Sequence, residues 1–202
     1  MRHVACLLAF GLILAATERV AAADMVYGLS TFAWPGMSVA KLRTKIPPGL
    51  RLLCGTDRDL AAVAESDRPG LIVPEELAKA GVDRCGVFAT DGASKSWRVQ
   101  QTKLGDDPAD FWVLVLVDAN GVARVVQIEL AQPNTSFATT LDFFTQSYGP
   151  PPQRSPTAAR WKTGRSEALM TADERGVLKI GLIDNELQAL LDGRIAAGRH
   201  KQ

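Results

Sequence analysis

Apolar positions recur with a helical period in several parts of the chain. Val39, Leu42 and Ile46 form one stripe, which follows Ser38, a residue type that caps helix N-termini, and which stops at Pro47. The same reasoning from caps, glycine and proline predicts four helices and a shorter helical turn at 57–64. The four helices are expected at 39–46, 74–80, 134–148 and 185–196.

Other stretches are rich in β-branched and aromatic residues and are typical of strands. These strands are expected at 50–54, 84–90, 96–104, 110–118, 122–131, 158–162, 166–171 and 177–183. Asn120-Gly121, between two of them, is typical of a tight hairpin turn. A two-residue turn there pairs Val115 with Val126 and places Trp112, Leu114 and Leu116 together on the opposite face of the hairpin.

These elements predict an α+β fold with short helices packed on an antiparallel sheet. A helix that ends at Gly or Pro and is followed by antiparallel strands occurs twice along the chain. We expect one domain at 24–202, with two tandem helix-plus-hairpin repeats as a possible subdivision. The subrepeats would be 36–131 and 134–196.

The first apolar run predicts export. Arg2 and His3 precede a run from Val4 to Ala16, and small residues precede Asp24. This run is about 13 residues long, whereas a membrane-spanning helix needs about 20. We expect a signal peptide at 1–23, with cleavage one residue earlier as the alternative. The mature protein would be periplasmic or secreted, with no stable membrane anchor.

Export also determines the state of the cysteines. Cys6 leaves with the signal peptide, and Cys54 and Cys85 remain in an oxidising compartment. A disulfide between them is expected, with a redox pair as the alternative. The mature chain keeps one histidine, His200 near its end, so we expect no cofactor, no metal site and no His-dependent catalysis.

Charge and acidic clusters give little indication of chemistry. The chain has 23 basic and 22 acidic side chains, and removal of Arg2, Arg19 and Glu18 leaves 21 of each, so no nucleic-acid partner is expected. The densest acidic cluster is 106–110, which contains three aspartates. It is the candidate for a carboxylate-dependent hydrolase, with a solvated turn as the alternative.

Part of this layout carries a family resemblance. Gly36-Met37-Ser38 enters a short helix that ends at Pro47-Pro48-Gly49, and a later helix from Ser136 ends at Tyr148-Gly149-Pro150 before Trp161. This arrangement resembles the tandem modules of β-lactamase-inhibitor-protein-like and BamE-like envelope domains. The resemblance implies helices placed against small antiparallel sheets and a function in binding proteins.

We therefore expect an exported, non-catalytic module that binds another protein. The candidate binding face is an apolar strip of Trp112, Leu114 and Leu116, bordered by Arg98 and Gln100. The alternative for this continuous apolar run is a central strand buried on both faces. The alternative functions are a carrier of a small apolar ligand, held between sheet and helices, and the carboxylate-dependent hydrolase.

Overall fold

A computed structural model describes residues 25–29, 32–90, 96–105 and 107–199 of the 202-residue chain. The predicted signal peptide at 1–23, Asp106 and His200 lie outside the described residues. Within the described ranges, no helix is long and apolar enough to cross a membrane.

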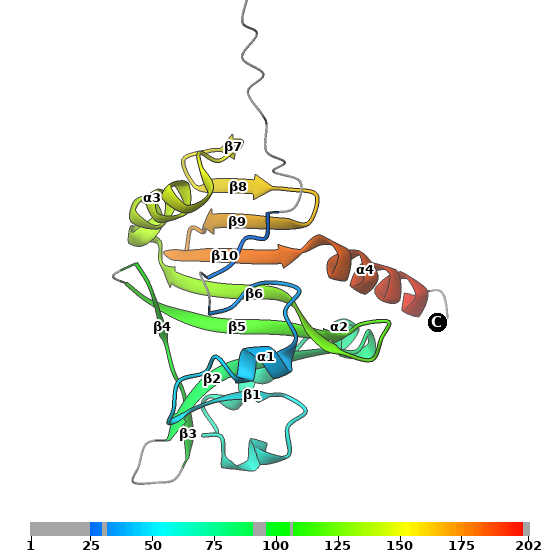
Figure 1. The fold of residues 1–202 in the computed structure, drawn as a ribbon. Helices are drawn as coiled ribbons and strands as arrows, with labels where there is room; N and C mark the ends of the chain where they lie inside the picture. Colours follow the sequence, from blue (N-terminus) through cyan, green and yellow to red (C-terminus); the bar gives the residue numbers. More distant parts are fainter. Residues whose placement is uncertain (1–24, 30–31, 91–95, 106, 200–202) are drawn as a thin grey trace, which may run out of the picture.

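One antiparallel sheet of ten strands dominates the described part of the chain (Figure 1). The strand order is β1-β2-β5-β6-β10-β9-β8-β7, with β3 paired to β2 and β4 paired to β5. The strands are β1 Leu50–Cys54, β2 Val82–Thr90, β3 Trp97–Val99, β4 Thr102–Leu104, β5 Asp107–Val117, β6 Ala123–Pro133, β7 Gln153–Arg154, β8 Ala158–Lys162, β9 Ser166–Ala172 and β10 Val177–Asp184. Because β10 pairs with β6, the two halves of the chain share one sheet.

The helices lie close to their predicted positions. They are α1 Val39–Arg43, α2 Glu75–Lys79, α3 Phe137–Tyr148 and α4 Asn185–Arg199, with 3-10 turns η2 Arg58–Ala62, η3 Arg68–Leu71 and η4 Asn134–Ser136. Ser38 caps α1 as expected, since its hydroxyl accepts a hydrogen bond from the N–H of Lys41 at 3.2 Å. Gly149 ends α3 with a φ of 80°, a conformation that favours glycine.

The predicted fold class is wrong. An α+β layout of short helices on an antiparallel sheet, with tandem helix-plus-hairpin repeats, was expected from local patterns. The described residues instead form one large continuous sheet, and α1 and α2 have only five residues each. Local periodicity identified the strands, but the joining of β6 to β10 depends on long-range pairing. The domain at 24–202 and its subrepeats at 36–131 and 134–196 stay predictions.

The β5–β6 hairpin has its predicted register over part of its length. Leu114 pairs with Gln127 as expected, but Val115 pairs with Val125 because a β-bulge shifts the register. The turn is longer than Asn120-Gly121 and covers 118–122 between the strands. Asp118 organises it by accepting hydrogen bonds from the backbone N–H groups of residues 120 and 122.

Each face of the sheet packs against different segments. The front face, toward the viewer in Figure 1, carries Phe111 and Val113. It is covered by residues 25–29 and 32–46, which include α1, and by α3. The back face carries Leu114 and Leu116 and packs against α2 and α4. These helices cover the back face over β2, β5 and part of β6 and leave the strands beyond without a comparable cover.

The N-terminal segment 25–29 is held by side chains from the second half of the chain. The Tyr148 hydroxyl accepts a hydrogen bond from the N–H of Gly28 at 2.9 Å and donates one to the Gly28 carbonyl. The Ser166 hydroxyl accepts from the N–H of Tyr27 and donates to the carbonyl of Met25, both at 2.9 Å. Burial raises the pKa of Tyr148, so its hydroxyl keeps the proton that it donates.

Candidate functional site

Two residues of the predicted binding strip are buried. Leu114 is 8% exposed and Leu116 is fully buried, because both pack with Leu187 and Leu191 of α4 and with residues of and beside α2. The exposed apolar strip expected from the sequence is therefore not found. The structure agrees with the alternative interpretation of this apolar run, because β5 is a central strand that is buried on both faces over these positions.

Trp112 is the half-buried member of the strip, and its ring packs closely against neighbouring residues. Its ring lies over Gly70 and Gly86, where an added Cβ would come within 2.4 Å and 2.6 Å of ring atoms. Phe88 packs edge-on against it, with ring centroids 6.3 Å apart. The Arg84 guanidinium lies 4.9 Å from the centre of the Trp112 ring. Two glycines and an aromatic neighbour thus fix the indole, and a cation stacks on it.

Arg98 and Gln100 are held by other partners. The Arg98 side chain pairs with Asp67 at 3.4 Å. The Gln100 amide donates a hydrogen bond to the Gln101 carbonyl at 3.1 Å. The cation stacked on Trp112 is Arg84, which the sequence analysis did not select.

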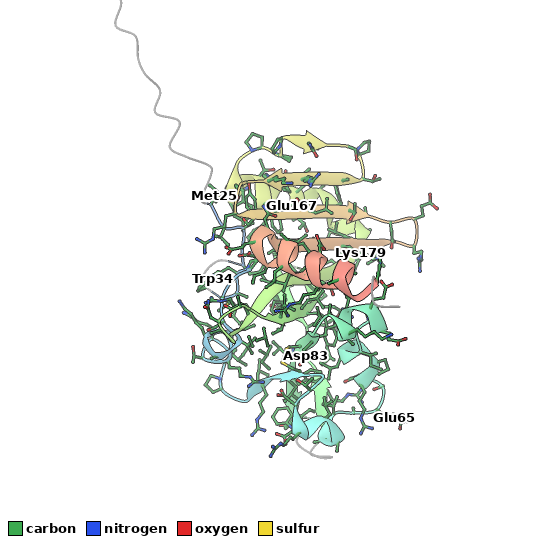
Figure 2. The ribbon with its side chains drawn as sticks, turned by 90° about the vertical axis from the view of Figure 1, so that its right-hand side faces the viewer. Met25, Trp34, Glu65, Asp83, Glu167 and Lys179 are labelled. Carbon is green, nitrogen blue, oxygen red and sulfur yellow. A yellow bond between two sulfur atoms is a disulfide. The ribbon has the colours of Figure 1, made fainter. Side chains whose placement is uncertain are left out.

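A different part of the sheet is open to solvent on its back face, and we call it the open sheet face. Its residues are Gln127 and Glu129 of β6, Lys179, Gly181 and Ile183 of β10, Glu167, Leu169 and Thr171 of β9, and Arg160 and Lys162 of β8. Each of them is half-buried or exposed. On the opposite face of β8, β9 and β10, the side chains of Trp161, Met170 and Ile180 are at most 2% exposed. Figure 2 labels Glu167 and Lys179 on these strands.

The open sheet face continues to Trp112 through the strand register. Leu169 pairs with Gly181, Gly181 with Glu129, and Glu129 with Trp112, so these four residues form a row across the sheet. At Gly181 an added Cβ would meet only the Gln127 amide, at 3.6 Å. The row therefore has apolar side chains at Leu169 and Trp112, with Gly181, which has no side chain, and Glu129 between them.

Ion pairs organise the charges on this face. Arg84 binds Glu129 at 2.9 Å, and Arg160 binds both carboxylate oxygens of Glu167 at 2.7 Å. The hydrogen bonds that Arg160 donates to the Glu167 carboxylate raise the pKa of Arg160. The Nε of Arg84 is buried without a hydrogen-bond partner. These pairs hold long side chains in fixed positions, which favours specific recognition over flexible charge attraction.

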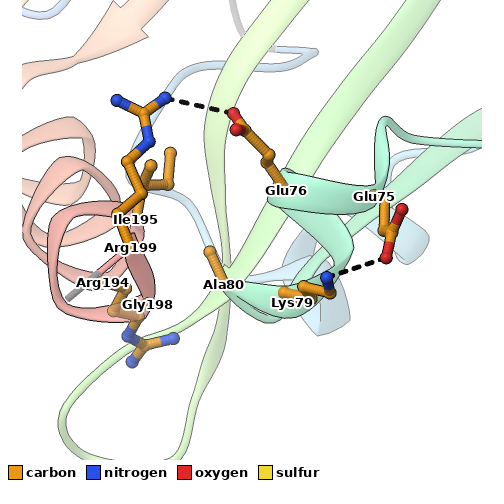
Figure 3. A pocket seen from close by; sticks show the side chains of 8 residues that line it. All are labelled: Glu75, Glu76, Lys79, Ala80, Arg194, Ile195, Gly198 and Arg199. Atoms are coloured by element: carbon orange, nitrogen blue, oxygen red, sulfur yellow. Dashed lines mark hydrogen bonds and ion pairs between the residues drawn. The ribbon is translucent and has the colours of Figure 1, made fainter. Parts of the chain in front are cut away.

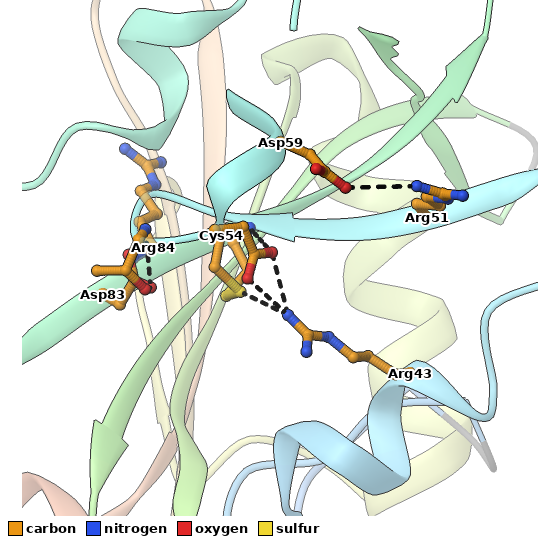
Figure 4. Close-up of polar contacts among 9 residues, drawn as sticks. Arg43, Arg51, Cys54, Asp59, Asp83 and Arg84 are labelled. Carbon is orange, nitrogen blue, oxygen red and sulfur yellow. Dashed lines mark hydrogen bonds and ion pairs between the residues drawn. A yellow bond between two sulfur atoms is a disulfide. The ribbon is translucent and has the colours of Figure 1, made fainter. Parts of the chain in front are cut away.

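The predicted disulfide is confirmed and lies outside this face. Cys54 of β1 and Cys85 of β2 are directly opposite each other and are bonded, with an S–S distance of 2.05 Å. Arg43 of α1 reaches this region and binds the Asp57 carboxylate at 3.0 Å (Figure 4). Asp83 lies near the two sulfurs, but sulfurs bonded to each other offer no thiolate for a metal.

A groove of about 270 Å³ separates α2 from α4 (Figure 3). Its charged side chains bind one another or the backbone. Arg199 pairs with Glu76 at 3.2 Å, Lys79 pairs with Glu75 at 2.8 Å, and Arg194 donates a hydrogen bond to the Val117 carbonyl at 2.7 Å. The packing of α2 beside α4 explains the groove. Its lining residues form no arrangement of acid, base and nucleophile.

The described members of the acidic cluster have structural partners. Asp107 accepts a hydrogen bond from the Ser136 hydroxyl at 2.6 Å, and Asp110 accepts one from the Gln101 amide at 2.9 Å. Asp106 lies outside the described residues. These two contacts hold the N-terminal part of β5 in place.

Sequence reasoning missed the open sheet face for an identifiable reason. Residues 158–162, 166–172 and 177–184 alternate between buried and more exposed positions, and that period-two signal is visible in the sequence. Their neighbour Glu129 is about 50 residues from Gly181 in sequence, and only the pairing of β6 with β10 joins them.

Comparison with models of protein families, with curated proteins and with solved structures found no match. The resemblance to the β-lactamase-inhibitor-protein-like and BamE-like modules stays a prediction. The chain can be classed by its own structure as a protein built on one large antiparallel sheet with a cross-strand disulfide. The disulfide is compatible with an extracellular or periplasmic protein.

Proposed function

We propose that this chain is an exported, non-catalytic module that binds another protein through the open sheet face. The observation that carries the proposal is the row from Leu169 through Gly181 and Glu129 to Trp112, with Arg84 stacked on the indole. Tryptophan and arginine are enriched among the residues that dominate binding energy in protein interfaces. Here both are held in place before any partner arrives, which lowers the entropy lost on binding.

The charges on this surface favour a partner with carboxylate groups. Four cations and two acidic side chains lie on the open sheet face and at Arg84 beside it. The cations are Arg84, Arg160, Lys162 and Lys179, and the acids are Glu129 and Glu167. A complementary surface would carry apolar side chains over Leu169 and Trp112 and acidic groups toward β8 and β10.

Site-specific photo-crosslinking tests this proposal. A photoreactive residue replaces exposed Thr171 in the full-length protein produced in its own host, and Val122 at the hairpin turn serves as the matched exposed control. We expect one discrete protein adduct from position 171 and none of that mass from position 122. No adduct at position 171, or the same adducts from both positions, would contradict the proposal.

A further inference from the structure

The sheet contains a fork between β2 and β5. The two strands pair from Val82–Leu116 to Gly86–Trp112 and then separate, because β2 continues with β3 and β5 continues with β4. The bend at 100–101 joins β3 to β4 and crosses the fork. It is fixed by a hydrogen bond from the N–H of Gln100 to the Val87 carbonyl at 2.8 Å.

The two faces of this fork are filled differently. On the back face, Phe88, Val99 and Trp112 belong to or pack against one apolar cluster. On the front face, the floor is formed by Val87 and Phe111, which belong to the main core. The front face keeps a pocket of about 210 Å³ at this point. We call it the fork pocket.

The walls of the fork pocket are apolar and uncharged. Phe32, Pro47 and Leu50 complete the walls above Val87 and Phe111, and residues 100–102 form the rim. The rings of Phe32 and Phe111 lie 5.6 Å apart. None of the lining residues is Lys, Arg, Asp, Glu or His, in contrast to the groove between α2 and α4. A charged ligand would lose its hydration here without a counterion.

The rim amides already have hydrogen-bond partners. Gln100 donates to the Gln101 carbonyl at 3.1 Å, and the Gln101 amide donates to Asp110 at 2.9 Å. These bonds hold the bend in position and engage the amide donors nearest the opening. The apolar walls below this rim supply most of the contact surface for an occupant.

The pocket volume limits the size of the occupant. An apolar cavity of about 150 Å³ is enough for benzene, while drug-sized ligands occupy roughly 300–1,000 Å³. We propose that the fork pocket binds a small, neutral, apolar molecule the size of one aromatic ring or a short aliphatic chain. This site is independent of the open sheet face, which lies on the opposite side of the sheet.

Methyl NMR with toluene as the probe tests this inference. In the exported protein, toluene should cause saturable shifts of the Leu50 and Val87 methyl signals. Pyrene, which is too large for about 210 Å³, should cause none. Shifts that increase linearly without saturation, or equal shifts throughout the core, would overturn the inference.

Two variants that fill the pocket make the test specific. Leu50→Trp adds bulk at the wall, and Gln100→Trp adds it from an exposed rim position, where the core is not altered. We expect at least a tenfold loss of toluene affinity in each folded variant. Ile72→Trp, at a position that is 68% exposed and outside the pocket, should bind as the unmodified protein does. Unchanged affinity in Gln100→Trp would overturn the inference even if Leu50→Trp failed to fold.

Discussion

Trp112 shows how single residues shape this sheet. Its indole occupies the space that side chains at positions 70 and 86 would need, so glycine at both positions is a steric requirement. Neither glycine has a positive φ, so their role is to leave space and does not concern backbone conformation. The indole in turn supports the Arg84 guanidinium above it.

Gly86→Ala should destabilise the protein because its new Cβ would lie 2.6 Å from a Trp112 ring carbon. We expect a loss of about 1–3 kcal/mol in the free energy of unfolding, measured with urea. Gly181→Ala is the matched control in the same sheet, where the nearest atom is 3.6 Å away. That variant should be unchanged or more stable by about 0.4–1 kcal/mol. Equal losses in both variants would contradict the steric explanation.

Tyr148 fixes the N-terminal segment through two hydrogen bonds to Gly28. Tyr148→Phe leaves both Gly28 backbone groups without this partner and should cost about 1–3 kcal/mol of unfolding free energy. Ser147→Ala, one residue away, removes only an exposed bond to the Phe143 carbonyl and should change stability by less than about 0.5 kcal/mol. A similar, small effect of both substitutions would show that the segment is held by apolar packing alone.

Asp118 gives the β5–β6 turn a pH dependence. The hydrogen bond from Arg124, together with those from the backbone of residues 122 and 120, lowers the pKa of Asp118 from 3.8. Because this pKa is lower in the folded than in the unfolded state, the stabilisation is complete above the unfolded pKa and is lost as pH falls through the folded pKa. The difference in Tm between the unmodified protein and Asp118→Asn should therefore be constant above about pH 5 and shrink on acidification below about pH 4. A difference that stays the same down to pH 2 would contradict this role.

At the scale of elements, the disulfide joins the edge strand β1 to β2. The two cysteines are 31 residues apart in sequence, and the bond closes the loop that contains η2, η3 and α2. The paired Cys54→Ala and Cys85→Ala substitutions should lower the free energy of unfolding by about 2–4 kcal/mol. Urea denaturation without reductant measures this, and the unmodified protein after reduction should fall to a similar value. An unchanged midpoint would show that packing alone holds β1.

Most individual elements could be predicted from the sequence because their signals are local. Leu50–Cys54 and Ala158–Lys162 have the predicted bounds, and α1 has its predicted cap. The predicted strand at 96–104 is instead two strands, since the bend at Gln100 follows the separation of β2 from β5. The fold class and the Val115 register were missed because they depend on long-range pairing and on the turn length.

The candidate site was less predictable than the elements. An apolar run such as Trp112–Leu116 has the same local pattern whether one face is exposed or helices cover both. Its burial depends on α2 and α4, which are distant in sequence. The open sheet face and its row to Trp112 depend on residues contributed by four strands, β5, β6, β10 and β9, from both halves of the chain.

At the scale of the whole molecule, the two faces of the sheet are covered unequally, and this determines which surfaces can bind a partner or a ligand. The front face is covered by residues 25–29 and 32–46 and by α3, except at the fork pocket. The back face is covered over β2, β5 and part of β6, and it is open from the rest of β6 across β10 and β9 to β8. A rigid sheet with one exposed face can present side chains to a partner without a conformational change.

The most direct measurement is the affinity of the crosslinked partner, once identified, for two charge variants of the exported protein. Leu169→Arg places a charge at one end of the row, and Val122→Arg places the same charge at the distant hairpin turn. The account predicts a loss of affinity of at least tenfold for Leu169→Arg and no change for Val122→Arg, with both variants folded. Equal affinity of the two variants, or a loss confined to Val122→Arg, would contradict binding through the open sheet face.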